Sequence, residues 1–286
     1  MIAEFYDDVE KFYDHAFSFL IKREAENSLI FSLLNALKLN INLYGDLPPL
    51  LILVKSDENI EFVSIQTPPF NLVLSYTDNL QTIEILITNL IQRNIELPGV
   101  LGPKNMVRKF LDLWCTSKNI NSKLNNNERI FKLTRVSKDT LGKRKVIRST
   151  KKYHSLIIRW AKDFIKEAFP ESSEVQMENI EKRLEPEIEQ GNFFLLLENE
   201  EVVSMARKAG KTPNGNLVNY VYTPPALRRR GYATECVAFL SKHILEERNQ
   251  FCFLFTDLSN PISNSIYQKI GYRTVIDVDQ YEFVSK

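Results

Sequence analysis

The sequence predicts an α/β protein built from two similar halves. Helical and strand-like segments alternate along all 286 residues, and the same order of segments occurs twice. Residues 51–54 and 71–77 of the first half can be aligned with residues 194–197 and 216–223 of the second. A period of roughly 140 residues is typical of a duplicated domain and not of a short structural repeat.

In the first half, apolar residues at three- and four-residue steps predict helices between Met1 and Leu43. Short runs rich in Leu, Ile and Val predict the strands that follow. These elements are strands at 50–54, 60–66 and 71–76, a helix at 80–94, a helix after Gly102-Pro103, a polar loop at 119–127 and a strand at 129–136.

The second half is predicted to repeat this order. Two helices are followed by three strands, a helix, a strand, a short helix and a last strand. Their predicted bounds are helices at 152–169 and 175–188, strands at 193–198, 202–208 and 217–223, a helix at 231–248, a strand at 251–256, a short helix after Pro261 and a strand near 281–284.

The two halves are expected to meet in a basic, polar stretch without apolar periodicity. We therefore predict a first domain at residues 1–136, a linker at 137–150 and a second domain at 151–286.

Composition places the chain among globular proteins. It is 44% apolar and 26% charged, and its net charge of +1 provides no overall field that would attract nucleic acid or an anionic membrane. The N-terminus carries acids and lacks the basic and apolar regions of a signal peptide. No apolar stretch is long enough to cross a bilayer. We therefore expect a cytoplasmic protein with no nucleic-acid or membrane partner.

The cysteines and histidines give no metal-binding pattern. Cys115, Cys236 and Cys252 lie in separate apolar stretches, and the three histidines are widely spread. We expect buried cysteines, no disulfide framework and no metal site.

The most informative segment runs from Tyr222 to Thr234. A strand leads through two prolines and three arginines into Gly231, where an amphipathic helix begins. The first N–H groups of a helix have no intrahelical acceptor, and the helix dipole is positive at this end. Such a turn binds anions, and we expect a pyrophosphate. The first half has Asp78-Asn79 at the corresponding place, so it should not bind the same group.

The segment Arg228-Arg229-Arg230-Gly231-Tyr232-Ala233 resembles the acyl-CoA signature of the GNAT acetyltransferase superfamily, Arg/Gln-x-x-Gly-x-Gly/Ala. The later segment from Asn260 to Tyr272 resembles the second GNAT signature, Asn-x-x-Ala/Ser-x-x-x-Tyr-x-x-x-Gly-Phe/Tyr. Their order, with a strand between them, makes the match specific over roughly residues 151–286. The first half looks like the degenerate half of two-domain members. The resemblance implies tandem GNAT-like domains, each with a mixed, mostly antiparallel sheet flanked by helices.

The resemblance also implies the roles of individual residues. Tyr267 would donate a proton to the departing CoA thiolate, and Asn260 and Ser263 would contact CoA. The strand before the turn would diverge from its neighbour at a bulge and pair with the pantetheine arm. The implied CoA-binding residues are Val221, Tyr222, Thr223, Arg228, Arg229, Arg230, Gly231, Tyr232, Ala233, Thr234, Asn260, Ser263 and Tyr267.

Other interpretations of these residues stay open. The arginines can form a solvated surface run, and Tyr267 can be a half-buried aromatic residue beside Ile266 and Ile270. Asn260 is also a good helix N-cap before Pro261. No general base can be assigned, since the acid Asp257 is better explained as a turn or cap residue.

These features predict an N-acetyltransferase that moves an acetyl or other acyl group from acetyl-CoA to a primary amine by direct transfer. Positioning of thioester and amine would supply most of the catalysis. One alternative is a sensor or scaffold that binds acyl-CoA without catalysis. Another is a general nucleotide-binding protein that uses the same anion turn. The sequence identifies neither the acceptor amine nor the oligomeric state.

Overall fold

The protein is described from a computed structural model of the chain, which covers residues 1–169, 174, 177–247 and 250–285. It divides into two compact units. The first unit contains residues 1–130, 256–259 and 274–286, and the second contains residues 131–255 and 260–273. No helix in the described ranges is long and apolar enough to span a membrane.

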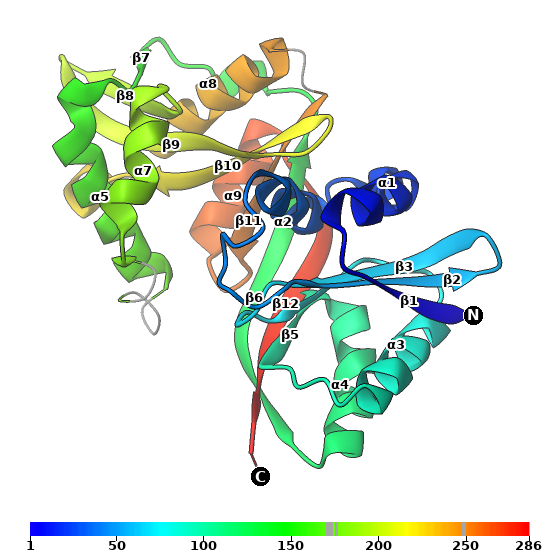
Figure 1. Ribbon diagram of the computed structural model, residues 1–286. Helices are drawn as coiled ribbons and strands as arrows, with labels where there is room; N and C mark the ends of the chain where they lie inside the picture. Colours follow the sequence, from blue (N-terminus) through cyan, green and yellow to red (C-terminus); the bar gives the residue numbers. More distant parts are fainter. Residues whose placement is uncertain (170–173, 175–176, 248–249, 286) are drawn as a thin grey trace. The chain divides into compact units, whose positions relative to one another are not determined.

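The first unit is built on a mostly antiparallel sheet (Figure 1). Strand β4 pairs antiparallel with β3 and parallel with β5. Residues 278–282 of β12 then pair antiparallel with β5, and β6 lies next to β12. The bounds of its strands are β1 (Ile2–Tyr6), β2 (Leu50–Ser56), β3 (Asn59–Gln66), β4 (Leu72–Leu74), β5 (Gly99–Pro103), β6 (Asn121–Leu133) and β12 (Arg273–Val284).

Helices cover both faces of this sheet. On one face, α1 (Val9–Leu20) and α2 (Ser28–Leu39) pack on alternate residues of β2 and β3, such as Leu51 and Leu53. On the other face, α3 (Gln81–Gln92) and α4 (Lys104–Lys118) pack on Ile52 and Val54. Successive side chains of a strand point to opposite faces, so a central strand covered on both sides is apolar throughout.

The second unit has the same layered construction. Strands β7, β8, β9 and β10 pair antiparallel in chain order, and β11 pairs parallel with β10. Their bounds are β7 (Lys145–Arg148), β8 (Phe193–Glu198), β9 (Glu201–Lys211), β10 (Gly215–Tyr222) and β11 (Phe251–Asp257). The predicted α/β class, with mostly antiparallel strands flanked by helices, is confirmed.

Two pairs of helices enclose the sheet of the second unit (Figure 1). Helices α5 (His154–Ala168) and α7 (Ile180–Glu189) form one hydrophobic cluster with Phe193 and Leu195 of β8. Helices α8 (Tyr232–Glu246) and α9 (Pro261–Ile270) form another with Phe194 and Leu196. The first two residues of the predicted helix 175–188 and the end of the helix 231–248 lie outside the described residues.

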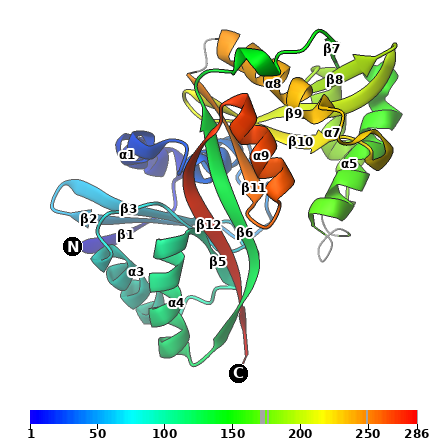
Figure 2. The same cartoon turned by 180° about the vertical axis from the view of Figure 1, so that it is seen from behind.

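Two segments differ from the sequence predictions. Residues 2–6, expected in a helix, form β1, which pairs with β2. Residues 121–127, expected in a polar loop, belong to β6, which Figures 1 and 2 show running beside β12. Both segments obtain their partners from distant parts of the chain, so local composition does not reveal them as strands.

The division of the chain also differs from the predicted boundaries at 136 and 151. The second unit begins at Phe131, and the expected linker 137–150 contains β7, which pairs with β8 along residues 145–148. Residues 274–286, expected in the second domain, belong to the first unit because β12 pairs with β5 there. Strand pairing, and not sequence order, therefore determines where each unit ends.

Candidate acyl-CoA site in the second unit

The site begins where β10 and β11 separate. The parallel pairing of the two strands covers only Gly215 to Leu217 opposite Phe251 to Phe253. On its other edge, β10 pairs with β9 as far as Tyr222, with a register shift between Asn219 and Tyr222. Tyr220 has a φ of 47°, in the left-handed region that a β-bulge often needs. The bulge and divergence expected from the resemblance are both present.

The last two residues of β10 and Thr223, which follows them, face different surroundings. Val221 packs on the cluster that contains α8 and α9. The ring of Tyr222 lies in the opposite cluster, 5.8 Å from that of Trp160, and burial raises its pKa. The Thr223 hydroxyl lies 2.9 Å from the Ser204 hydroxyl, which also donates to the Tyr222 carbonyl at 3.1 Å. These contacts fix the strand end and leave its β11-facing edge unpaired with β11 beyond Leu217.

The next part of the site is the turn between β10 and α8. Gly231 is the N-cap of α8 with a φ of 79°, and Arg229 has a φ of 64°. Among the described residues, no acceptor is found for the backbone N–H groups of residues 229–234, and the next N–H, that of Glu235, bonds to the Gly231 carbonyl at 3.1 Å. Free N–H groups and the positive end of a helix dipole favour an anion, as the sequence analysis expects at this turn.

Gly231 leaves room in this turn. A Cβ built on it would meet no heavy atom within 4 Å, so the space beside its backbone is open. The side chains of Arg229 and Arg230 are exposed and have no ion-pair partner in the described part of the chain. The turn thus fits a diphosphate, which can accept hydrogen bonds from the backbone and from the two guanidinium groups.

Arg228 has a different environment from its two neighbours. Its Nε donates to the Thr223 carbonyl at 2.9 Å, and its Nη2 contacts both carboxylate oxygens of Glu167 on α5 at 2.7 and 2.8 Å. Its guanidinium therefore ties the end of β10 to α5. Its predicted role in CoA binding remains a prediction, and the side-chain contacts point to a role in holding the turn.

A second ion-pair network binds the first turn of α8 at Glu235. Glu235, only 4% exposed, accepts hydrogen bonds from the Arg144 backbone N–H at 2.8 Å and from Arg144 Nη1 at 2.6 Å. Arg144 also pairs with Glu198, and these two partners raise the pKa of its guanidinium, Glu198 more than Glu235. This network was not predicted, because Arg144 lies in the segment expected to be a linker.

Tyr267 lies on the buried face of α9. It is 9% exposed, and its ring centroid lies 6.3 Å from that of Phe131 and 5.9 Å from that of Tyr272. Burial raises the pKa of Tyr267 to about 12, so its hydroxyl keeps its proton at neutral pH. Tyr267, Tyr232 and Val218 belong to one cluster, on which Val221 and Leu227 also pack. The structure therefore brings α9, α8 and the end of β10 together.

The start of α9 has the predicted cap. Asn260 Oδ1 accepts a hydrogen bond from the Ser263 N–H at 3.1 Å, and Pro261 is the first helical residue. Gly271 ends the helix with a φ of 114°. Ala233 and Thr234 are partly buried in the first turn of α8, and Ser263 is partly buried in that of α9. Contacts of these residues with CoA remain predictions.

The corresponding turn in the first unit is capped by its own residues. The N–H of Gln81 bonds to Asn79 Oδ1 at 3.2 Å, and the N–H of Thr82 bonds to the Asn79 carbonyl at 3.2 Å. Asp78 accepts a hydrogen bond from the Tyr76 hydroxyl at 2.6 Å and pairs with Arg23 at 3.5 Å. A negative side chain and a capped helix start do not favour an anion at this place.

Two carboxyl groups of the first unit, those of Glu128 and Asp257, interact electrostatically. Burial, together with the nearby charge of Asp257, raises the pKa of Glu128 on β6 to about 7. Asp257 Oδ1 accepts a hydrogen bond from the Ser259 N–H at 2.7 Å, which is the turn role that the sequence favoured. Glu128 lies between the loop predicted at 119–127 and the strand predicted at 129–136, so the sequence did not indicate its burial. In the described residues, no group of three or more potential metal ligands is found.

Comparison with known proteins supports the superfamily assignment. Residues 196–284 match the family model described as FR47-like protein. Over 99% of this chain, the fold is similar to a GNAT-family acetyltransferase from Colwellia psychrerythraea, with a TM-score of 0.57, 11% identity and 100% of that chain covered. A Drosophila protein gives a TM-score of 0.65 at 10% identity, over 99% of this chain and 98% of its own.

A third solved structure is also similar over nearly the whole chain. A GCN5-related N-acetyltransferase from Sphaerobacter thermophilus gives a TM-score of 0.58 at 14% identity, over 99% of this chain and 96% of its own. No curated protein matches the sequence. The chain thus has the fold of the GNAT superfamily throughout its length, and the predicted resemblance to that superfamily is confirmed.

The raised pKa of Glu128 predicts a pH-dependent stability. The folded-state pKa of about 7 exceeds the ordinary value of 4.5, so the folded protein holds a proton that the unfolded chain has lost between these pH values. Stability from this group is complete below pH 4.5 and is lost as the pH rises through about 7. Relative to Glu128→Gln, the wild type should therefore lose stability between pH 5 and pH 8.

Urea unfolding midpoints of the two proteins across this range measure the difference. Glu282→Gln, an exposed site on β12, is the control and should follow the wild type. If the midpoints of Glu128→Gln and the wild type change in parallel with pH, Glu128 titrates normally and the account of its burial is wrong.

Proposed function

We propose that the protein is a GNAT-type N-acetyltransferase that moves an acetyl group from acetyl-CoA to a primary amine by direct transfer. The observation that carries the proposal is the start of α8, where uncapped N–H groups surround the open space beside Gly231. The second unit would be catalytic, and the first would be a degenerate GNAT-like unit whose corresponding turn is capped by Asn79. Acetyl-CoA would supply an activated acyl group as its thioester.

Different residues of the second unit would bind different parts of acetyl-CoA. N–H groups of residues 229–234, with the side chains of Arg229 and Arg230, would hold the diphosphate. The unpaired edge of β10 at Val221 to Thr223 would bind the pantetheine arm by backbone hydrogen bonds, and a strand N–H there would polarise the thioester carbonyl. Asn260 and Ser263 would line the other side from the start of α9.

Tyr267 would supply the proton that the CoA sulfur gains in the reaction. In the transfer, the amine nitrogen forms a bond to the acyl carbon, the carbon–sulfur bond breaks, the amine loses a proton and the thiolate gains one. The pKa of Tyr267, raised to about 12 by burial, keeps the phenol protonated at neutral pH and able to donate. Water would accept the proton of the amine, with backbone carbonyls orienting it by hydrogen bonds, since β10 carries no carboxylate between Leu217 and Tyr222.

The first test of the site is Gly231→Glu. A carboxylate in the open space beside this backbone would repel the diphosphate and compete for the same N–H groups, so CoA affinity should fall by roughly 100-fold. Calorimetric titration with CoA measures this loss. Gly231→Ala is the control, because it shares the strain of a side chain at φ 79° but adds no charge.

Two results would count against the proposed phosphate position. One is a Gly231→Glu variant that binds CoA as tightly as Gly231→Ala. The other is competition of ATP or NAD with CoA at equal affinity, which would favour general nucleotide binding.

The second test is Tyr267→Phe. Loss of the phenolic proton should lower the turnover number by about 100-fold and change CoA affinity by less than about twofold, because the ring remains in its cluster. Release of free thiol from acetyl-CoA with a panel of primary amines measures turnover. Tyr272→Phe is the matched control, since its hydroxyl lies 2.8 Å from that of Ser241 inside the core.

If Tyr267→Phe turns over like the wild type, the proton-donor role is wrong. If the wild type binds CoA but releases no thiol with any amine, the protein is a sensor or scaffold and the proposed function is wrong.

A further inference from the structure

Arg207 on β9 is a partly buried cation without a carboxylate partner in the described part of the chain. Its Nε donates to Asn219 Oδ1 at 3.0 Å. Its guanidinium carbon lies 4.8 Å from the ring centroid of Tyr220 and 5.9 Å from that of Phe193. Burial among these rings lowers the pKa of the guanidinium. A charge removed from water is costly unless an opposite charge accompanies it, so this arrangement calls for an anion.

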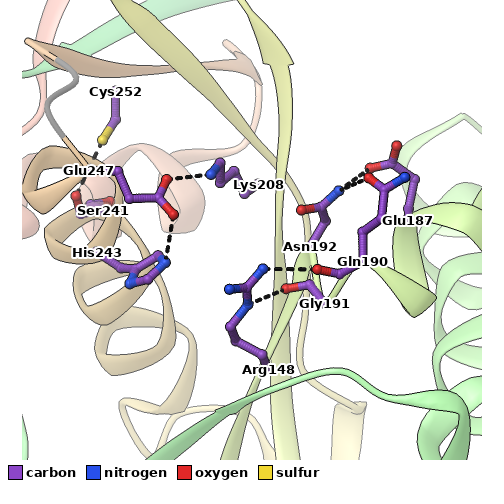
Figure 3. A network of polar contacts seen from close by, with 10 residues as sticks. All are labelled: Arg148, Glu187, Gln190, Gly191, Asn192, Lys208, Ser241, His243, Glu247 and Cys252. Carbon is purple, nitrogen blue, oxygen red and sulfur yellow. Dashed lines mark hydrogen bonds and ion pairs between the residues drawn. The ribbon is translucent and has the colours of Figure 1, made fainter.

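One acid that attracts Arg207 already has another hydrogen-bond partner. Glu187 on α7 attracts Arg207 electrostatically but makes no ion pair with it within the described residues. Instead, Glu187 accepts a hydrogen bond from Asn192 Nδ2 at 3.2 Å (Figure 3). Arg183 adds a further positive charge to the surroundings of Arg207. Glu187 therefore acts on Arg207 only over a distance, and among the described residues no carboxylate contacts the Arg207 guanidinium directly.

The C-terminal end of α7 is bound by Arg148. Figure 3 shows Arg148 of β7 pointing to the end of α7, where its guanidinium donates to the carbonyls of Gly191 at 2.9 Å and Gln190 at 2.8 Å. A cation that binds the last carbonyls of a helix also complements the helix dipole. Glu187 and Asn192 are thus fixed in place, and Glu187 keeps its separate hydrogen bond.

The position of Arg207 connects it with the proposed acyl site. Arg207 is the register partner of Asn219, which directly precedes the bulge residue Tyr220 on β10. The bulge lies in the part of β10 that no longer pairs with β11. It is next to the residues that are proposed to bind the pantetheine arm. Phe164 of α5 also packs on the Tyr220 ring, at a centroid distance of 5.2 Å. Arg207, Tyr220 and Phe164 therefore form one cationic and aromatic surface beside the bulge.

We propose that Arg207 binds a carboxylate of the acceptor, so that the acceptor amine belongs to the amino acid class. This inference rests on the proposed acetyl transfer and specifies its second substrate. The Nη groups of a guanidinium match a carboxylate with two parallel hydrogen bonds, which a lysine ammonium cannot reproduce. The aromatic rings reduce access of water to these bonds and so strengthen them. The same rings provide apolar contact for an acceptor side chain.

The experiment compares matched amines with and without a carboxylate. The probes are phenylalanine with phenethylamine, and glycine with methylamine, and thiol release from acetyl-CoA gives kcat and KM. The wild type should prefer the carboxylate member of each pair. Arg207→Met keeps a long apolar side chain but removes the charge, and it should raise KM for the carboxylate member by roughly 10- to 100-fold. Its KM for phenethylamine and its affinity for CoA should not change.

Two further variants test whether the preference depends on the guanidinium of Arg207 in particular. Arg207→Lys keeps the charge and should restore only part of the preference. Lys208→Met removes a cation from the next position of β9, where Lys208 pairs with Glu247, and should leave the preference intact. An equal preference in wild type and Arg207→Met would overturn the inference while the transfer itself remained established.

A binding measurement separates the inference from the proposed function. Calorimetric titration of N-acetylphenylalanine into the CoA complex measures carboxylate binding without turnover. Binding to the wild type that is lost in Arg207→Met supports the role of Arg207, and absence of binding to the wild type overturns it. Failure of CoA to bind and of every amine to release thiol would instead overturn the acetyltransferase function.

Discussion

The site depends on one constraint, the uncapped start of α8. Four or more backbone N–H groups gathered at the end of a helix need acceptors, and side chains usually supply them. In the second unit, no acceptor for residues 229–234 is found among the described residues, whereas Asn79 caps the corresponding helix of the first unit. An anion is the natural partner for such a turn. The contrast between the units therefore indicates where a phosphate group would bind.

Other contacts hold this turn in place without filling it. Arg228 ties it to Glu167 and to the Thr223 carbonyl, and Arg144 ties the first turn of α8 to the buried Glu235. Both ion pairs lie beside the turn, so the N–H groups stay available. The divergence of β10 from β11 supplies the second requirement, because it leaves a strand edge that can bind an extended chain by backbone hydrogen bonds.

Local turns and caps of the second unit could be predicted from the sequence more accurately than the limits of the two units. The turn at Gly231, the cap at Asn260 and the end of α9 at Gly271 follow from local preferences of glycine, asparagine and proline, so they could be inferred from single residues. Strand β1 and residues 121–127 of β6 could not, because their pairing partners are distant in sequence. The same holds for Arg144 with Glu235 and for Arg207 with Asn219, whose contacts exist only after the sheet has formed. The isolated charges in the sequence contain no information about these contacts.

The most direct measurement of the central claim is a titration of the isotope-labelled protein with CoA, observed through its backbone amide resonances. The account predicts that the amides of residues 229–234 shift and become protected from exchange, with Gly231 among the most affected, while those of residues 79–82 in the first unit do not change. Binding of CoA that leaves the amides around Gly231 unchanged would contradict the account.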